Sequence, residues 1–451
     1  MLKGKIVKAD PLSTTKYYLC DGTGIKIVQT NQRLDEGDCV EVEGREENGI
    51  TISEEISKIK QFSVEKFFQI RLHQPAKPLV DTEVMKHLER HFNEAAHLIA
   101  KAVLELRQIK LRYDGDGDGI MAGLIMKKAI EHYAEEKNVP LFLSCQQSQR
   151  TYLHRDLQDD TSALLEGAVI VFLDYGSSPD SREHVCTASQ RFEVIVVDHH
   201  PPDKKLCAAV FVSPFQTELK EPSSNYNAGL LAFEIGRRLA PQIENQLKDY
   251  AIYSMESDHS AYAGRNIEKD GEGEAARAIS YLSVVGQQPR QLDFYETILS
   301  DKSKVKELAR EEQEKIQRAL QKALKKAKTN QLHGKDGEML FVQADLTSAV
   351  AKNEYPSRGR LTNAVQDHFA AASKEPVISI NWDLDSLSFR ATASAVKKGF
   401  SANKVITALK KEFGTTIMGG GHDIAAGLRF PKELMKSVVQ RTIEIVKEQN
   451  G

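Results

Sequence analysis

Carboxylate and imidazole side chains follow three apolar runs of the sequence, at the point where each predicted strand ends. The clusters are Asp114, Asp116 and Asp118 after IKLRY, Asp174 after AVIVFL, and Asp198, His199 and His200 after EVIVV. If these strands are neighbours in one parallel sheet, the clusters meet, and the carboxylates raise one another's pKa unless cations lie among them. Mixed carboxylate and imidazole ligands suit two Mn²⁺ or Mg²⁺ ions. Such a pair hydrolyses phosphoesters by activating a bridging water.

A calcium loop is the main alternative for the D-x-D-x-D run. An EF-hand loop needs glycine at its sixth position and a bidentate glutamate at its twelfth. Counted from Asp114, the sixth residue is Gly119 but the twelfth is Ile125, which argues against calcium. Acids at strand ends are also common in ordinary turns. That explanation suits one cluster better than three, so the set favours a metal site.

The segments that carry these clusters alternate between strand and helix patterns. Apolar strand runs at 109–113, 140–145, 168–174, 192–198 and 208–213 are interleaved with helical patterns at 120–136, near 179–190 and at 228–239. This alternation predicts a doubly wound α/β domain with a mainly parallel sheet. Ligands of such sheets bind at the carboxyl ends of the strands, where the three clusters lie.

Residues 1–60 contain five short strand patterns separated by DGTG, DEGD and EENG turns. Five strands in so short a segment predict a small β-barrel resembling an OB-fold. OB-folds often bind single-stranded nucleic acid through aromatic and basic side chains, which Tyr17, Tyr18 and the neighbouring lysines could supply. A purely structural or protein-docking barrel remains an equal alternative.

The remaining segments complete the predicted organisation. Residues 61–108 form a helical connector, with apolar residues spaced by three or four from Val84 to Leu106. Residues 109–300 form the domain with the acidic clusters, and residues 301–332 form a charged linker helix. Residues 333–451 contain further strands, a short helix and the glycine-rich GTTIMGGGHDIAAG, which together predict a second, smaller α/β domain.

Bulk composition limits the class of protein. The 451 residues carry a net charge of −3, which excludes a polybasic binder, so any positive surface must be local. The sequence contains no apolar run long enough to span a membrane and no signal peptide at its start, so a cytoplasmic location and no membrane partner are expected. The five cysteines contain no C-x-x-C pair, and reduced, mostly structural thiols are expected.

The motifs together resemble the DHH/DHHA1 phosphoesterase family, over about residues 110–430. Six motifs occur in the family's order: D-x-D-x-D-G at Asp114–Gly119, Asp174, Asp198-His199-His200, Asp258 after a helix, Arg390 on a strand, and Gly419-Gly420-Gly421-His422. The resemblance implies a metal-binding DHH domain followed by a substrate-binding DHHA1 domain. It is greatest to the RecJ-like exonucleases, and among them to the archaeal helicase-associated type.

The resemblance also implies roles for individual residues. Asp116 and Asp174 would hold one ion, and Asp118, Asp174, His199 and Asp258 the other, with Asp174 bridging. Asp198 and His200 would support the metal-bound imidazole or lie near the phosphate. Arg390, Gly420, Gly421 and His422 would bind phosphates of the substrate. Mn²⁺ is the expected cation, with Mg²⁺ as the alternative.

One position departs from the family pattern. Many members have a histidine ligand two residues before the first acid of the D-x-D-x-D run, where this sequence has Arg112. Either Asp114 substitutes as a ligand of the first ion or that ion binds weakly, and we favour Asp114.

The resemblance and the barrel together predict a single-strand-specific exonuclease for DNA, RNA or both, acting in repair or replication. The archaeal type acts from the 3′ end, which is the expected direction; RecJ-like 5′-to-3′ digestion is one alternative. Others are a phosphodiesterase for short oligonucleotides or cyclic dinucleotides and, less favoured, a non-catalytic replisome component. Single-stranded nucleic acid is the expected partner, with a repair helicase or another replication or repair protein as a second. The sequence does not indicate the oligomeric state.

Overall fold

The computed structural model describes residues 1–10, 12–21, 24–60, 70–148, 151–266, 272–285, 291–334, 337–351, 354–421 and 423–450. The chain forms two compact units. The first consists of Met1–Ser283 with Gln288–Val305, and the second of Val284–Gln287 with Lys306–Gly451. Within the described ranges, every helix is too short or too polar to cross a lipid bilayer.

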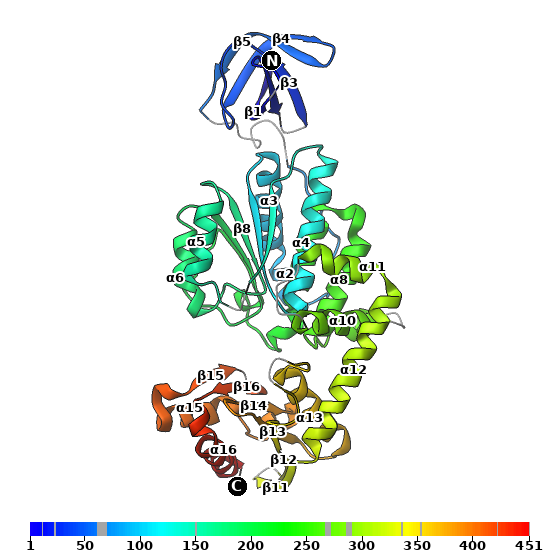
Figure 1. The fold of residues 1–451 in the computed structure, drawn as a ribbon, viewed down its shortest axis with the longest axis vertical. Helices are drawn as coiled ribbons and strands as arrows, with labels where there is room; N and C mark the ends of the chain where they lie inside the picture. The colour runs from blue at the N-terminus through cyan, green and yellow to red at the C-terminus, as the bar shows by residue number, and fades with distance from the viewer. Residues whose placement is uncertain are drawn as a thin grey trace. The chain divides into compact units, whose positions relative to one another are not determined.

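The N-terminal strands close into a barrel in the order β1-β2-β3-β5-β4 (Figure 1). Its strands are β1 (Leu2–Ala9), β2 (Lys16–Cys20), β3 (Ile25–Gln29), β4 (Cys39–Glu47) and β5 (Ile50–Lys58). Alternate side chains point inward, so that Tyr17, Leu19 and Val28 are buried in the barrel core. The predicted OB-like barrel is therefore confirmed.

A five-stranded parallel sheet forms the centre of the next part of the chain, in the order β10-β9-β8-β6-β7. Its strands are β6 (Ile109–Asp114), β7 (Leu143–Ser148), β8 (Val169–Leu173), β9 (Glu193–Val197) and β10 (Val210–Val212). Every residue of β6 and β8 is buried, as expected for strands covered on both faces.

Helices cover both faces of this sheet, with α5 and α6 on one side and α4 and α8 on the other (Figure 1). The helices of the first unit are α2 (Glu83–His87), α3 (Glu89–Leu104), α4 (Gly117–Glu136), α5 (His154–Ala163), α6 (Pro179–Ala188), α7 (Ala228–Leu239), α8 (Glu244–Ser257), α9 (Ala263–Asn266), α10 (Glu272–Val284) and α11 (Leu292–Ser300). Short 3₁₀ turns η1 (Pro214–Gln216), η2 (Ser223–Tyr226) and η3 (Pro241–Ile243) connect some of them. The predicted doubly wound architecture is confirmed.

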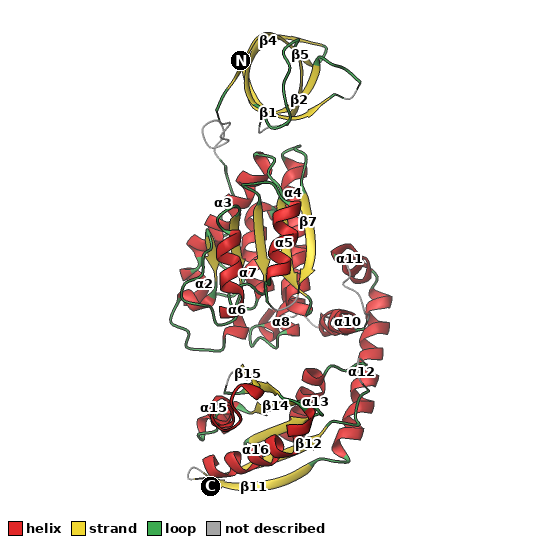
Figure 2. Cartoon of the chain, turned by 60° about the vertical axis from the view of Figure 1, so that its left-hand side comes forward, coloured by secondary structure: helices red, strands yellow, loops and turns green. Residues whose placement is uncertain are grey.

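The second unit contains a six-stranded sheet in the order β11-β12-β13-β14-β16-β15, in which only β12 and β13 pair in parallel among the described strands (Figure 2). Its strands are β11 (Lys328–Gly334), β12 (Gly337–Asp345), β13 (Val377–Trp382), β14 (Ser386–Ala391), β15 (Met418–Gly421) and β16 (Ala425–Arg429). Its helices are α13 (Arg358–Ala372), α14 (Ala393–Lys397), α15 (Ala402–Phe413) and α16 (Met435–Asn450), with 3₁₀ turns η4 (Gly414–Thr416) and η5 (Lys432–Leu434).

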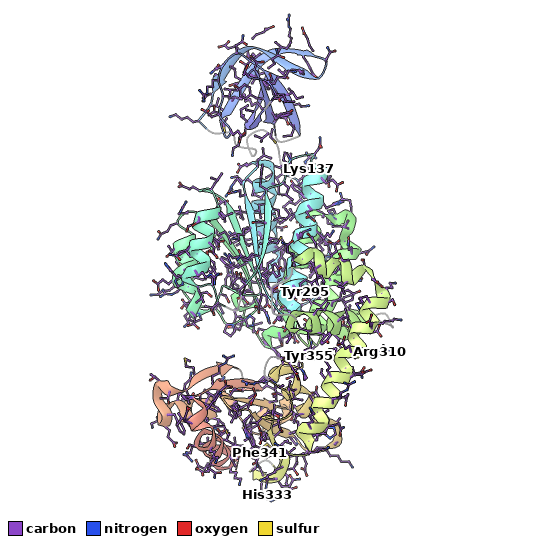
Figure 3. The ribbon with its side chains drawn as sticks, viewed as in Figure 1. Lys137, Tyr295, Arg310, His333, Phe341 and Tyr355 are labelled. Carbon is purple, nitrogen blue, oxygen red and sulfur yellow. A yellow bond between two sulfur atoms is a disulfide. The ribbon has the colours of Figure 1, made fainter. Side chains whose placement is uncertain are left out.

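The charged helix α12 (Lys302–Leu324), predicted to be a linker, also packs into the core of the second unit. Ala319, Leu320 and Ala323 belong to the apolar core of the second unit. The Tyr355 hydroxyl, labelled in Figure 3, donates a hydrogen bond of 2.6 Å to buried Glu312 of the helix. The predicted linker range 301–332 also extends into β11, so most of this range is part of the second unit.

The cysteines differ from expectation. Cys186 of α6 and Cys207, in the segment between β9 and β10, form a disulfide, whereas the described Cys20, Cys39 and Cys145 are free thiols. The expectation that all thiols are reduced is therefore wrong for one pair. Their separation of 21 residues carries no recognisable spacing motif, so only the fold brings the two sulfurs together.

Candidate metal centre

The three acidic clusters meet at one edge of the parallel sheet. β6, β8 and β9 are adjacent and parallel, so the segments after them emerge at the same edge. Asp114 ends β6, Asp174 follows β8 directly, and His199 lies two residues after β9. A fourth element contributes Asp258, which caps the carboxyl end of α8. The predicted convergence of the strand ends is thus observed.

Ligand atoms from these residues form three overlapping groups, each with its atoms within 4.8 Å of one another. We call them the Asp114 group (Asp114, Asp116, Asp174), the His199 group (Asp118, His199, Asp258) and the His200 group (Asp174, His199, His200). Asp174 belongs to two of the three. The Nε2 atom of His199 lies 3.6 Å from Asp118, 3.3 Å from Asp174 and 3.4 Å from Asp258.

The Asp174 backbone has a conformation that few residues adopt. Its φ angle is +65°, in the left-handed region that asparagine and aspartate tolerate better than other non-glycine residues. The residue is 2% exposed, and its backbone N–H donates a hydrogen bond of 2.9 Å to the carbonyl of Val197. The fold therefore holds this carboxylate at the centre of the site at some cost in backbone energy.

Two buried carboxylate oxygens of the site are suited to binding cations. Asp174 Oδ1 and Asp258 Oδ2 are buried, yet receive no hydrogen bond from any residue in the described ranges. Burial and the charges of Asp118 and Asp116 raise the pKa of both carboxyl groups well above the usual value. Unpaired buried carboxylates are costly, and divalent ions relieve both the desolvation and the repulsion. The donor set of carboxylates with an imidazole suits Mn²⁺ or Mg²⁺ better than Ca²⁺.

Asp118 is held in place by residues of α7 and α8. Its carboxylate accepts hydrogen bonds from the Ala228 and Gly229 N–H groups at the start of α7, both at 2.8 Å, and from the Ser254 hydroxyl at 2.5 Å. Burial and the charge of Asp116 raise the pKa of Asp118 to about 6, although these three bonds act in the opposite direction. A Cβ atom at Gly229 would overlap the Ser254 hydroxyl, so only glycine allows this close approach.

Asp116 begins the helix that carries Asp118. Its side chain accepts hydrogen bonds from the Asp118 and Gly119 N–H groups, at 3.1 and 3.2 Å, as the N-cap of α4. The same carboxylate belongs to the Asp114 group. The D-x-D-x-D spacing therefore supplies three ligand positions, of which Asp116 is also the helix cap.

The two histidines of the triplet differ in environment. Burial and the neighbouring His200 lower the pKa of His199 to about 4, which favours the neutral, ligating form. Burial also lowers the pKa of His200, but its bond of 2.9 Å to Asp198 and the nearby acids outweigh burial and raise the value to about 9. Asp198 is itself held by the Ser177 hydroxyl at 2.6 Å. His200 is thus half-exposed, and in the metal-free protein its surroundings favour the protonated ring.

Arg112 does not face the metal groups. Its fully buried guanidinium makes a two-pronged contact with Asp160 of α5, both N–O distances being 2.7 Å. Lys110 lies 2.7 Å from the same carboxylate, and the Tyr152 hydroxyl donates to it at 2.8 Å. Since Asp114, and not Arg112, contributes to a ligand group, the geometry favours Asp114 as the substitute ligand.

The predicted substrate-binding residues lie in the second unit. Arg390 on β14 donates to the Asn363 side chain at 2.6 Å and to the Phe389 carbonyl at 2.8 Å. Gly420 and Gly421 belong to the exposed strand β15, where Gly421 has a φ of +144°. His422 lies outside the described residues. The phosphate-binding role of these four residues stays a prediction.

Sequence reasoning missed the residues that support the ligands. Ser254, Ser177, Gly229 and Asp160 are all buried in this region. Ser254 lies one helical turn before Asp258 on α8, a spacing that places both on one face of the helix. That spacing was the available signal, whereas the partners of Gly229 and Asp160 follow only from the fold.

Lowering the pH is expected to weaken cation binding. Because the metal-free pKa of Asp118 is about 6, ions must displace protons below that pH. Each displaced proton weakens binding by roughly tenfold per pH unit. Calorimetric titration with Mn²⁺ between about pH 8 and about pH 5 measures this, and buffers of different ionisation enthalpy report the released protons. An affinity independent of pH would contradict the assignment of Asp118.

The sequence of this region matches a known family. Residues 109–253 match the model of the DHH family, N-terminal domain. This part of the chain is a DHH domain. It carries Asp114, Asp116, Asp118, Asp174, His199 and His200, whereas Asp258 follows just after the matched range. The DHH domain supports the phosphoesterase class of hydrolases that the motifs predict.

Several solved structures and a curated protein are similar to the chain that contains this DHH domain. The DHH domain of a member of a ribosomal protein family has a TM-score of 0.70 and 22% identity, covering 84% of this chain and 95% of that one. The exonuclease RecJ bound to manganese has a TM-score of 0.51 and 18% identity, covering 79% and 94%. These likenesses show the shared fold.

The curated relative is an uncharacterized protein of Methanocaldococcus jannaschii, 25% identical over 434 residues. The alignment covers 84% of this chain but only 57% of the relative. The chain therefore spans little more than half the length of that protein.

Proposed function

We propose that this protein is a metal-dependent exonuclease that hydrolyses single-stranded DNA or RNA from the 3′ end. The observation that carries the proposal is the cluster of the Asp118, Asp174 and Asp258 carboxylates around His199 Nε2, in which buried oxygens of Asp174 and Asp258 receive no hydrogen bond from the described residues. Two divalent ions held there by the Asp114 and His199 groups would activate a water and neutralise the charge that develops on phosphorus. The similar RecJ structure contains manganese, which supports Mn²⁺ as the cation.

The protein's own residues supply the rest of the chemistry. His200 is half-exposed beside Asp174, and its bond to Asp198 raises the pKa of the ring in the metal-free protein, so it can donate a hydrogen bond to a phosphate oxygen. Asp198 holds the His200 ring through Nδ1, which leaves Nε2 for the substrate. Arg390 is a further donor that suits phosphate geometry.

The barrel supports single-stranded nucleic acid as the substrate. Strands β1, β2 and β3 carry five lysines and no acid, whereas β4 and β5 carry six glutamates and two basic residues. Strand register places Tyr18 opposite Ile27, outside the barrel, whereas Tyr17 is core and its hydroxyl accepts a bond from the Leu34 N–H. The lysines of β1, β2 and β3 and the outward-facing Tyr18 are the kinds of side chain that nucleic-acid-binding OB-folds use.

The direction of digestion rests on the resemblance to the archaeal helicase-associated nucleases. That resemblance also implies a role in DNA repair or replication and a helicase or a similar protein as partner. Digestion of a long single strand labelled at either end tests the activity and its direction. We expect a 3′ label to be released at once as mononucleotide, while 5′-labelled strands shorten gradually. Immediate release of a 5′ label would reverse the direction, and cleavage of dinucleotides alone would favour the short-oligonucleotide alternative.

Replacing Tyr18 by alanine in the full chain is expected to weaken binding of long single strands by roughly tenfold, because base stacking on the ring is lost. Dinucleotide hydrolysis should not change, since the barrel does not contribute to the ligand groups. Fluorescence anisotropy with a labelled single strand measures the affinity. Glu54→Ala on the acidic strand β5 is the control. Equal affinity of Tyr18→Ala and wild type would show that this face does not bind the strand.

A further inference from the structure

One segment supports two of the three ligands of the His199 group, Asp118 and Asp258. Residues 221–229, which we call the strap, contain η2 and end in the first residues of α7. At its end, the Ala228 and Gly229 N–H groups hold Asp118. In its middle, Asn225 accepts a bond from the Ala261 N–H at 2.9 Å, and its carbonyl accepts one from the Ser260 hydroxyl at 3.0 Å. Ser260 and Ala261 directly follow Asp258 and its neighbour, so the strap also fixes this ligand's segment.

The strap thereby contacts both Asp118 and the segment after Asp258 within nine residues of chain. Displacing the strap would therefore move Asp118 and Asp258 of the His199 group. The Asp114 group would stay in place, because Asp114 and Asp174 are positioned by the ends of β6 and β8.

Glu221 anchors the beginning of the strap. Its carboxylate accepts hydrogen bonds from the Tyr226 hydroxyl at 2.5 Å, the Tyr262 hydroxyl at 2.7 Å and the Asn225 amide at 2.9 Å. Tyr226 and Tyr262 are buried, and Glu221 itself is partly buried. Bonds to an ionised acceptor are about twice as strong as neutral ones. The Glu221 carboxylate therefore joins the start of the strap to the end of η2 and to the segment that follows Asp258.

We infer that Glu221 is a positioning residue that sets the affinity of the ion held by Asp118, His199 and Asp258. This inference rests on the metal centre that underlies the proposed function. The competing explanation is that Glu221 only stabilises the fold. The two differ in selectivity, because a positioning role weakens one ion site, whereas a structural role weakens both sites together with the thermal stability.

The test measures Mn²⁺ binding by the full chain carrying Glu221→Gln. An Asp116→Asn background leaves the His199 group as the complete site, so a single binding step is expected there. In that background we expect Glu221→Gln to weaken Mn²⁺ binding by about tenfold to a hundredfold, the usual effect of removing a group that orients a ligand. With Asp116 present, the first of two Mn²⁺ ions should bind as in wild type, and the electron paramagnetic resonance signal of the coupled pair should disappear.

Two further variants make the result decisive. Tyr262→Phe removes one hydroxyl and should weaken the same ion by a smaller factor, while exposed Glu218→Gln on the same connection should change nothing. Unchanged Mn²⁺ affinity in Glu221→Gln, or equal weakening of both ions, would overturn the inference, as would fewer than two ions in wild type. Because these measurements need no nucleic acid, a wild-type protein that binds two ions without digesting strands would contradict the proposed function alone.

Discussion

Replacing Asp174 by asparagine is expected to lower the rate of hydrolysis by at least about a thousandfold, since a carboxylate shared by two of the metal-ligand groups is lost. The same change should stabilise the metal-free protein. Asparagine keeps the size of the side chain and tolerates the left-handed backbone at this position. It also removes a buried charge that its neighbours repel.

The sign of the stability effect follows from the pKa of Asp174. A carboxyl group whose folded pKa is raised favours the native state at low pH, and this contribution is lost as the pH rises through the folded value. In chelator near neutral pH, Asp174→Asn should therefore melt at a higher temperature than wild type, and the difference should vanish near pH 4, the ordinary value for aspartate. Adding Mn²⁺ should stabilise wild type more than the variant.

Thermal melts with and without Mn²⁺, together with hydrolysis of a single strand, measure both effects. Asp180→Asn, on the exposed first turn of α6, is the matched control and should behave as wild type. A variant that retains wild-type activity would exclude Asp174 as a ligand. A metal-free variant less stable than wild type would show that the acidic cluster is not under electrostatic strain.

Asp160→Ala is expected to produce the largest loss of stability, about 3 to 5 kcal/mol, because it leaves two buried cations without their counter-charge. Asp160 is fully buried and lies 2.7 Å from both Lys110 and Arg112. Both cations belong to β6, the strand that ends at Asp114. Loss of this network should therefore also disturb the Asp114 group.

Chemical denaturation of Asp160→Ala measures the change in the free energy of unfolding. Asp159→Ala, one residue earlier on α5 and exposed, is the control for helix propensity and should cost little. Equal stability of the two variants would show that the Lys110–Arg112 pair is compensated by other groups, such as Asp156.

How well the sequence predicts a feature depends on how far apart along the chain the interacting residues lie. The strand ends and their acids were predictable, because parallel strands necessarily bring Asp114, Asp174 and His199 to one edge. The five barrel strands were predictable from local alternation and turns. Contacts between distant segments were not, since Asp118 meets Gly229 across 111 residues and Arg112 meets Asp160 across 48.

Helix α12 shows a different limit of sequence reasoning. Its charged residues obscure a narrow apolar stripe, and Leu320 with Ala319 and Ala323 could have indicated packing against a sheet. The pairing of Cys186 with Cys207 likewise depends on the approach of α6 to the segment between β9 and β10. Composition suggested a linker helix and reduced thiols, whereas tertiary packing buries part of α12 and pairs two of the cysteines.

The central claim is that cations held by the Asp114 and His199 groups enable phosphodiester hydrolysis. The most direct test strips the protein with a chelator and follows digestion of a single strand as Mn²⁺ is added back, in wild type and in Asp174→Asn. We predict no digestion in chelator, recovery in wild type as two ions bind, and no recovery in the variant. Digestion by the stripped protein, or equal recovery of both proteins, would contradict the claim.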